Sequence, residues 1–262
     1  MRRPIITLTT DFGLQDHFVG VMKGVILSIA PEAQLVDITH DISPQQIAEA
    51  AFTIAEAYRW FPKKTVHVVV VDPGVGTQRR PILVEGGGHR FVGPDNGVFS
   101  MVMERETCSV REITAQRFFL KPLSQTFHGR DVFSPVAAHL AKGVTPSQFG
   151  KKIADALRSE FAKLHRVGKR SWTANVLKVD RFGNLITGFA VQDFPQLGQC
   201  VFELQAGMER ISLLVHSYAE APPNEAVLIA GSAGYYEVVV NCGSAAKKLG
   251  LAAGSPLELT IW

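Results

Sequence analysis

The chain has 262 residues, of which 46% are hydrophobic and 19% are charged. This composition excludes an intrinsically disordered protein, and the length allows one or two folded domains. The formal net charge of +3 arises from 27 basic and 24 acidic residues, an excess too small to indicate a nucleic-acid partner. No segment approaches the ~20 apolar residues of a membrane span, and the three cysteines form neither a metal-binding pair nor a disulfide framework. We therefore expect a cytoplasmic protein with reduced thiols.

The first part of the chain, from residue 4 to about residue 145, alternates β-branched runs with helical patterns. Such alternation is typical of βαβ units, and it predicts an α/β fold with a mainly parallel sheet and flanking helices. The patterns predict strands at 5–9, 34–38 and 65–71, a hairpin of 81–85 and 90–92, and helices at 18–29, 44–60, 97–104 and 132–142.

A charged, weakly patterned stretch from about residue 153 to residue 170 precedes the second part. Strand-like alternation returns in "TANVLKVDRFGNLITGF", without intervening helices. Short strands with turn signals between them are typical of a small all-β sandwich or barrel. We expect two domains, an N-terminal α/β domain over 1–170 and a C-terminal all-β, barrel-like domain over 171–262. The further strands predicted in the second domain are 201–204, 211–215, 226–229, 236–240 and 257–261.

Two carboxylates, Asp11 and Asp72, follow predicted strands of the first domain. Ligands of open parallel sheets bind beyond the carboxyl ends of the strands, so both acids should lie on one rim. Turn chemistry explains either acid alone, but two acids on one rim favour a functional site. Arg79 follows Asp72 across the glycine-rich bend "DPGVGTQRR" and can return toward it. The bend lacks the GKS/T ending of a phosphate-binding P-loop.

Two turns hold further polar candidates. His128 lies in "TFHGRD", just before a predicted helix whose expected cap is Asp131. Asp180 and Asn184 flank the Arg-Phe-Gly bend of "VDRFGNLITG". Each of these arrangements is also compatible with an ordinary turn.

A metal site is an open alternative at the rim. Asp16 precedes the helix 18–29, where a carboxylate can cap free backbone N–H groups. We expect His17 and His40 to be partly exposed helix and loop residues. No familiar zinc spacing such as HExxH is present. An oxygen and imidazole shell could nevertheless be supplied by Asp11, Asp16, His17, His40, Asp41 and Asp72.

Six sequence blocks, taken together and in order, resemble the S-adenosyl-L-methionine (SAM) hydroxide adenosyltransferase family, which is related to the SAM-dependent chlorinases and fluorinases. The resemblance spans nearly the whole chain. It implies an N-terminal α/β domain, a C-terminal β-barrel domain, and a homotrimer that binds SAM at the subunit interface. The blocks are "TLTTDFGLQDHFVGVMKGVI", "VVVDPGVGTQRRPI", "GPDNGVFS", "TFHGRDVFSPVAAHLA", "DRFGNLITGF" and "GSAGYYEVVVNCGSAA".

The resemblance implies an enzyme that hydrolyses SAM to adenosine and L-methionine. SAM is then the substrate, and neither a cofactor nor a metal is required. In this family an Asp, Arg and His set activates water for attack on the ribose C5′, and the set falls on Asp72, Arg79 and His128. The halogenases carry Tyr in place of this Asp. Because an acid suits water and repels halide, Asp72 indicates hydrolysis, as does the missing fluorinase insertion after Arg80.

The resemblance also assigns the residues that bind the substrate. Asp11 takes the two ribose hydroxyls, for which a carboxylate is a natural acceptor, and Asp16 faces the methionine ammonium. The other assignments are Phe127 and Tyr218 lining the nucleoside, Asn184 bonding adenine, and Asp180 and Ser232 holding the methionine end.

Three questions stay open at this point. The residues do not decide whether Asp72 or His128 is the base. A metal-dependent phosphohydrolase using the rim acids and histidines is an alternative enzyme. A non-enzymatic module that binds SAM or adenosine is the alternative outside enzymes.

Overall fold

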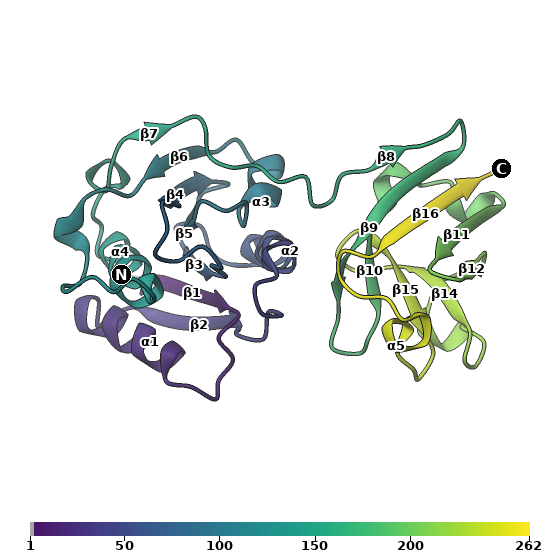
Figure 1. The fold of residues 1–262 in the computed structure, drawn as a ribbon, viewed down its shortest axis with the longest axis horizontal. Helices are drawn as coiled ribbons and strands as arrows, with labels where there is room; N and C mark the ends of the chain where they lie inside the picture. Colours follow the sequence, from purple (N-terminus) through teal and green to yellow (C-terminus); the bar gives the residue numbers. More distant parts are fainter. Residues whose placement is uncertain (1–2) are drawn as a thin grey trace. The chain divides into compact units, whose positions relative to one another are not determined.

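The computed structural model describes residues 3–262, which form two compact units. The first unit ends at Ser159, and the second runs from Glu160 to Trp262 (Figure 1). None of the described helices is long and apolar enough to cross a membrane.

The first unit contains a seven-stranded sheet with the order β2-β1-β3-β5-β4-β6-β7. The neighbours β2, β1, β3 and β5 pair in parallel, whereas β4, β6 and β7 continue the sheet with antiparallel pairs. This arrangement confirms the predicted α/β class. The strands are β1 Ile5–Thr10, β2 Gln34–Thr39, β3 Val66–Val70, β4 Pro81–Gly86, β5 His89–Pro94, β6 Ser109–Glu112 and β7 Lys152–Ile153.

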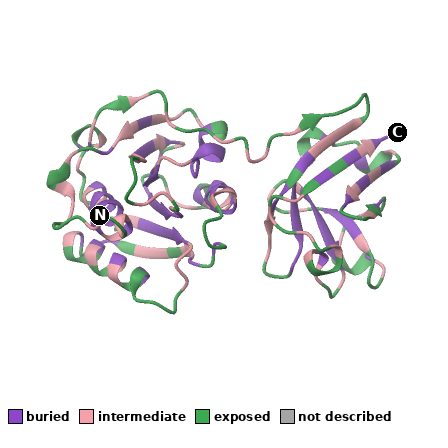
Figure 2. Ribbon diagram, in the orientation of Figure 1, coloured by how far each residue is buried: buried purple, intermediate pink, exposed green. Residues whose placement is uncertain are grey.

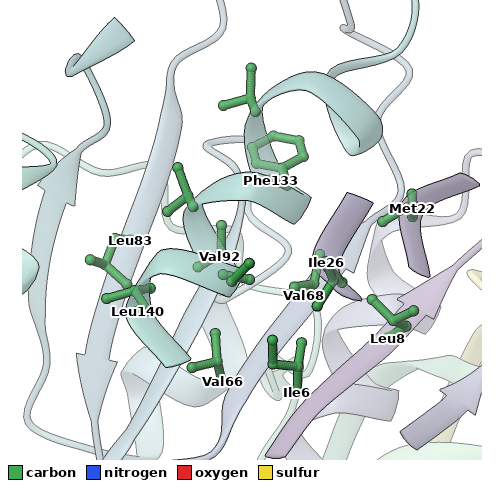
Figure 3. Close-up of a cluster of buried hydrophobic side chains, with 14 of the residues drawn as sticks. Ile6, Leu8, Met22, Ile26, Val66, Val68, Leu83, Val92, Phe133 and Leu140 are labelled. Carbon is green, nitrogen blue, oxygen red and sulfur yellow. The ribbon is translucent and has the colours of Figure 1, made fainter. Parts of the chain in front are cut away.

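Helices flank this sheet and bury apolar stripes against it. The helix α1 buries Val19, Met22 and Ile26, the spacing of one helix face. Every residue of β3 is buried, as a strand covered on both faces requires (Figure 2). Side chains from β1, β3, α1 and α4 form one core (Figure 3). The helices are α1 Phe18–Ile29, α2 Ile47–Ala57, α3 Ser100–Arg105 and α4 Ser134–Ala141.

Three helix starts differ from the sequence-based expectation. The helix predicted from residue 44 begins at Ile47, because Gln45 adopts a left-handed φ of 66°. The helix predicted from residue 97 begins at Ser100, after Gly97 with a φ of 94°. A π-helical turn, Gly129–Phe133, precedes α4 and contains Asp131. The expectation that Asp131 caps this helix is therefore wrong.

The second unit contains a nine-stranded, almost wholly antiparallel sheet, which confirms the predicted β class of this part (Figure 1). Its order is β12-β11-β16-β9-β10-β15-β14-β13, with β8 paired to β9. The strands are β8 His165–Arg166, β9 Ser171–Val179, β10 Leu185–Ala190, β11 Phe202–Ala206, β12 Glu209–Ile211, β13 Leu214–Val215, β14 Ala226–Ala230, β15 Tyr235–Val240 and β16 Pro256–Ile261.

Two features of this unit were not predicted. The single strand expected at 211–215 is two strands, β12 and β13, which lie at opposite ends of the strand order. A short helix, α5 Ala245–Leu249, follows β15. The Ser244 hydroxyl caps it by accepting from the Lys247 backbone N–H, and Gly250 ends it with a φ of 66°.

Candidate functional site

Six of the ten predicted site residues belong to the first unit, and most of them meet where β1 and β3 end. The two strands pair in parallel up to Thr10 and Val70, so the chain leaves both at the same edge of the sheet. A cavity of about 470 Å³ lies there, and Asp11, Asp72, Phe127 and His128 line it. The two acids therefore share one rim, as the order of strands and acids predicts.

A glycine-rich bend returns the chain from Asp72 to Arg79. The Val75 N–H donates to the Asp72 carbonyl, and the Thr77 hydroxyl donates to the Gly74 carbonyl at 2.7 Å. Gly76 has a φ of 77°, and a Cβ there would lie 2.2 Å from the Gln125 carbonyl oxygen. Glycine is thus required both by the backbone conformation and by the close approach of the segment that carries His128.

Arg79 joins the two polar groups of the cavity. Its Nε donates to both carboxylate oxygens of Asp72 at 2.9 Å, and its Nη2 also bonds this carboxylate. The same Nη2 lies 3.0 Å from Nδ1 of His128. The Asp72 and Arg79 side chains are only 5% and 9% exposed. Asp72 and His128 line the cavity, and Arg79 contacts both of them.

The contact with Arg79 defines the protonation state of His128. A guanidinium has only donors, so Nδ1 of His128 must be the acceptor and the neutral ring carries its proton on Nε2. Burial and the nearby Arg79 charge lower the pKa of His128 below its ordinary value of 6.5. At neutral pH this ring therefore has no nitrogen that is free to take a proton.

A hydrogen bond from the loop before α2 holds Asp11 in place. Its Oδ2 accepts from the Gln45 backbone N–H at 2.9 Å. The neighbouring Thr10 hydroxyl lies 2.9 Å from Nδ1 of His40, whose Nε2 is 3.1 Å from Asp37 Oδ1. His40 is buried. The expectation of a partly exposed loop residue is wrong, because both ring nitrogens contact neighbouring polar groups.

The residues next to α1 are arranged differently from the expectation. His17 is exposed, as predicted, and it occupies the N-cap position of α1 without a side-chain hydrogen bond. Asp16 is exposed and makes no capping bond, so the alternative in which it caps the helix is not seen. Asp16 lines an adjoining hollow together with Asp11 and His40.

The other four predicted residues belong to the second unit. Asp180 fixes the turn between β9 and β10. Its Oδ1 accepts from the backbone N–H groups of Phe182 and Asn184, and its Oδ2 accepts from Asn184 Nδ2 at 2.8 Å. Asn184 and Tyr218 line one cavity of about 620 Å³, and Tyr218 is 49% exposed. Ser232 is exposed in the turn between β14 and β15.

Two family models cover most of the chain. Residues 6–150 match the model described as the SAM hydroxide adenosyltransferase N-terminal domain, and residues 174–258 match the corresponding C-terminal domain. The chain belongs to the SAM hydroxide adenosyltransferase family. Both halves of the predicted site lie within the matched ranges.

Named relatives of this family member agree with the match. The "(R)-S-adenosyl-L-methionine hydrolase" of Salinispora arenicola is 36% identical over 98% of both chains. The "Fluorinase" of Nocardia brasiliensis is 26% identical over 99% of this chain and 98% of the relative. The solved structure of an "uncharacterized conserved protein" from Thermotoga maritima superposes with a TM-score of 0.89 at 35% identity, covering 97% and 99% of the two chains.

One buried acid of the second unit was missed by the sequence reasoning. Glu237 lies on β15 and is only 7% exposed. Its signal was a lone charge inside the otherwise apolar and aromatic run "YYEVVV". Within residues 3–262, no group of three or more His, Cys, Asp or Glu side chains is arranged to hold a metal ion.

Proposed function

We propose that this chain is a SAM hydrolase, which converts SAM and water into adenosine and L-methionine. The observation that carries the proposal is the cavity in which Asp72, held by Arg79, faces His128. The curated relatives with about one third identity bear the name of this activity. A carboxylate in this cavity suits a water nucleophile and repels a halide, which favours hydrolysis over the reaction of the fluorinase relative.

The proposed reaction is a single displacement at the ribose C5′. A bond forms between the water oxygen and C5′ while the bond from C5′ to sulfur breaks. Its electron pair stays on sulfur, so the sulfonium becomes the neutral thioether of methionine. The water loses one proton to a base. Because the leaving group is already activated, the protein mainly has to orient and desolvate one water, which can contribute several kcal/mol.

We assign the base to Asp72. Nδ1 of His128 accepts from Arg79, and Nε2 carries the proton of the neutral ring, so neither nitrogen can take a proton from water. Asp72 accepts from Arg79 on both oxygens but keeps further lone pairs, since a carboxylate has about four acceptor sites. Arg79 holds both groups in place, and His128 supplies an N–H donor.

The substrate-binding residues follow the same proposal. Asp11 accepts from the ribose hydroxyls and Phe127 lines the nucleoside, which fits their positions in the cavity. Asp16 faces the methionine ammonium. From the second unit come Tyr218 and Asn184 for the nucleoside, and Asp180 and Ser232 for the methionine end.

We further propose a cytoplasmic homotrimer with SAM bound at the subunit interface. Exposed apolar side chains beside each group of predicted residues support burial on assembly, namely Leu14 in the first unit and Phe182 in the second. The three cysteines, Cys108, Cys200 and Cys242, are all unpaired, which fits a reducing compartment.

Incubation of the pure protein with SAM, followed by chromatography of the products, tests the function. We expect adenosine and methionine in equal amounts, with or without EDTA. Activity that EDTA abolishes and zinc or magnesium restores would indicate the metal-dependent alternative. Tight adenosine binding with no turnover would indicate a binding module.

A further inference from the structure

Glu237 is an acidic residue at a buried position of the second unit. It lies in the middle of β15, opposite Ile186 of β10 and Ile229 of β14. The alternate residues Tyr236 and Val238 point into the apolar core, so Glu237 projects from the other face of the sheet. Its side chain forms no hydrogen bond or ion pair within the described chain. An ionised carboxylate buried without a partner destabilises the fold.

The Glu237 carboxyl group lies against one part of the proposed methionine site. It rests on the turn that carries Ser232, because a Cβ on Gly231 would lie 2.0 Å from Glu237 Oε1. Asp180 lies in the turn that leads into β10, the strand paired with β15 at Glu237. Burial and the Asp180 charge both raise the pKa of Glu237. Tyr218 is the third titratable group facing it, and burial and these two acids raise the pKa of Tyr218.

The two acids are not equivalent. Asp180 accepts three N–H bonds from Phe182 and Asn184. Glu237 receives none. The ligand-free protein therefore carries a buried carboxyl group that accepts no hydrogen bond near a second acid, and a cation with several N–H donors can bind both. The proposed substrate has such a group, an α-ammonium with three N–H donors.

We propose that Glu237 and Asp180 together bind the α-ammonium of the methionine part of SAM, and that Glu237 selects substrates with a free amino group. This inference rests on the proposed function and adds a residue to it. Asp16 can accept a third ammonium N–H, so its proposed contact is compatible. The Glu237 carboxyl group fills the space that a side chain at position 231 would need, which explains the glycine at this position.

Ligand binding to three compounds tests the inference. Calorimetry is done on full-length Asp72→Asn protein, which prevents turnover, with and without Glu237→Gln. The compounds are SAM, adenosine and a SAM analogue without the α-amino group. Loss of a charge-assisted bond should weaken SAM binding by about 10- to 100-fold. Adenosine and the deaminated analogue should change less than about twofold, because neither presents an ammonium.

The melting temperature should rise in the same variant in which the affinity for SAM falls. Glutamine resembles the protonated acid that the fold prefers, so Glu237→Gln should raise the melting temperature of the ligand-free protein at neutral pH. The matched control is Glu258→Gln on β16, an exposed position, which should change neither stability nor SAM affinity.

The outcomes are distinguishable. Unchanged SAM affinity in Glu237→Gln overturns the inference, and so does an equal loss for all three compounds with a lower melting temperature, which marks a structural role. If the wild-type protein binds SAM but forms no adenosine, the proposed function fails, while the calorimetric comparison still decides the role of Glu237.

Discussion

Asp72 and His128 face the same cavity but have different roles in the proposed reaction. Replacing Asp72 with Asn removes the proton acceptor and keeps the size of the side chain. We expect kcat to fall by about 10²- to 10⁴-fold, the usual contribution of a general base, while the KM for SAM changes by only a few fold. Steady-state kinetics measures both constants. An unchanged kcat would refute the assignment.

His128 serves the reaction as an acceptor for Arg79 and as a neutral ring. Because its pKa lies below 6.5, the ring is neutral at pH 7 and becomes charged only as the pH falls through that lower value. A protonated Nδ1 can no longer accept from Arg79, so kcat/KM should decline on this acid side. His128→Asn offers an amide oxygen to Arg79 and should keep more activity than His128→Ala. Equal losses in the two variants would indicate that His128 is the base.

Asp11 is expected to act through the ribose. Asp11→Asn exchanges one acceptor oxygen for a donor and removes the charge, which should cost SAM and adenosine about 1.5–3 kcal/mol of binding free energy. The loss for 2′-deoxyadenosine should be smaller, because one hydroxyl is missing. Calorimetry on the three ligands measures it. An equal loss for the deoxy compound would mean that Asp11 acts through the fold.

At the level of elements, β1, β3 and β5 share a buried pair of histidines. The Thr7 hydroxyl lies 2.7 Å from His67 Nδ1, and His67 Nε2 lies 3.1 Å from His89 Nδ1. Burial and the neighbouring His89 lower the pKa of His67 to about 3, and burial followed by the Lys63 charge lowers that of His89. The folded protein thus keeps both rings neutral, whereas the unfolded chain protonates them below about pH 6.5.

This pair predicts how stability depends on pH. Its contribution is complete above pH 6.5 and is lost as the pH falls toward the lower folded pKa values, because the unfolded state then binds more protons. Melting temperatures measured from pH 7.5 to 4.5 should fall for the wild type and fall less steeply for His67→Phe, which cannot titrate. Parallel curves for the two proteins would exclude His67 as a source of the acid sensitivity.

Sequence patterns predicted the helices and strands whose bounds depend on nearby residues. The strand predicted at 5–9 is found at 5–10, and the helix predicted at 18–29 from apolar spacing and the stop at Pro31 has those bounds. Contacts between distant residues escaped this reasoning. His40 became buried through Thr10 and Asp37, and two residues outside any strand, Ser212 and Leu213, separate β12 from β13.

In the candidate site, too, local patterns were predictable and contacts between distant residues were not. Asp11, Asp72 and their common rim were predictable, since parallel strands end at one edge. The bond from Arg79 to His128 was not, because residues 49 positions apart meet through a bend whose path sequence spacing does not define. Glu237 was visible in the sequence as a lone charge in an apolar strand, but its proposed role depends on the side chains around it in the fold.

For the whole molecule, the proposed trimer makes a prediction about mass and activity. Leu14 is 69% exposed beside the residues that line the first-unit site. Leu14→Asp should weaken assembly and lower activity together, whereas Met208→Gln, at a 98% exposed turn of the second unit, should change neither. Light scattering after gel filtration should give three times the 28.6 kDa chain mass for the wild type. A fully active monomer would contradict the assembly.

The origin of the oxygen in the product tests the hydrolysis most directly. The protein is incubated with SAM in water enriched in ¹⁸O, and the adenosine and methionine are analysed by mass spectrometry. We predict that one ¹⁸O atom enters adenosine at its 5′ oxygen and that methionine stays unlabelled, because the water oxygen bonds to C5′ as the bond from C5′ to sulfur breaks. Unlabelled adenosine, or 5′-methylthioadenosine in its place, would contradict attack of water on C5′.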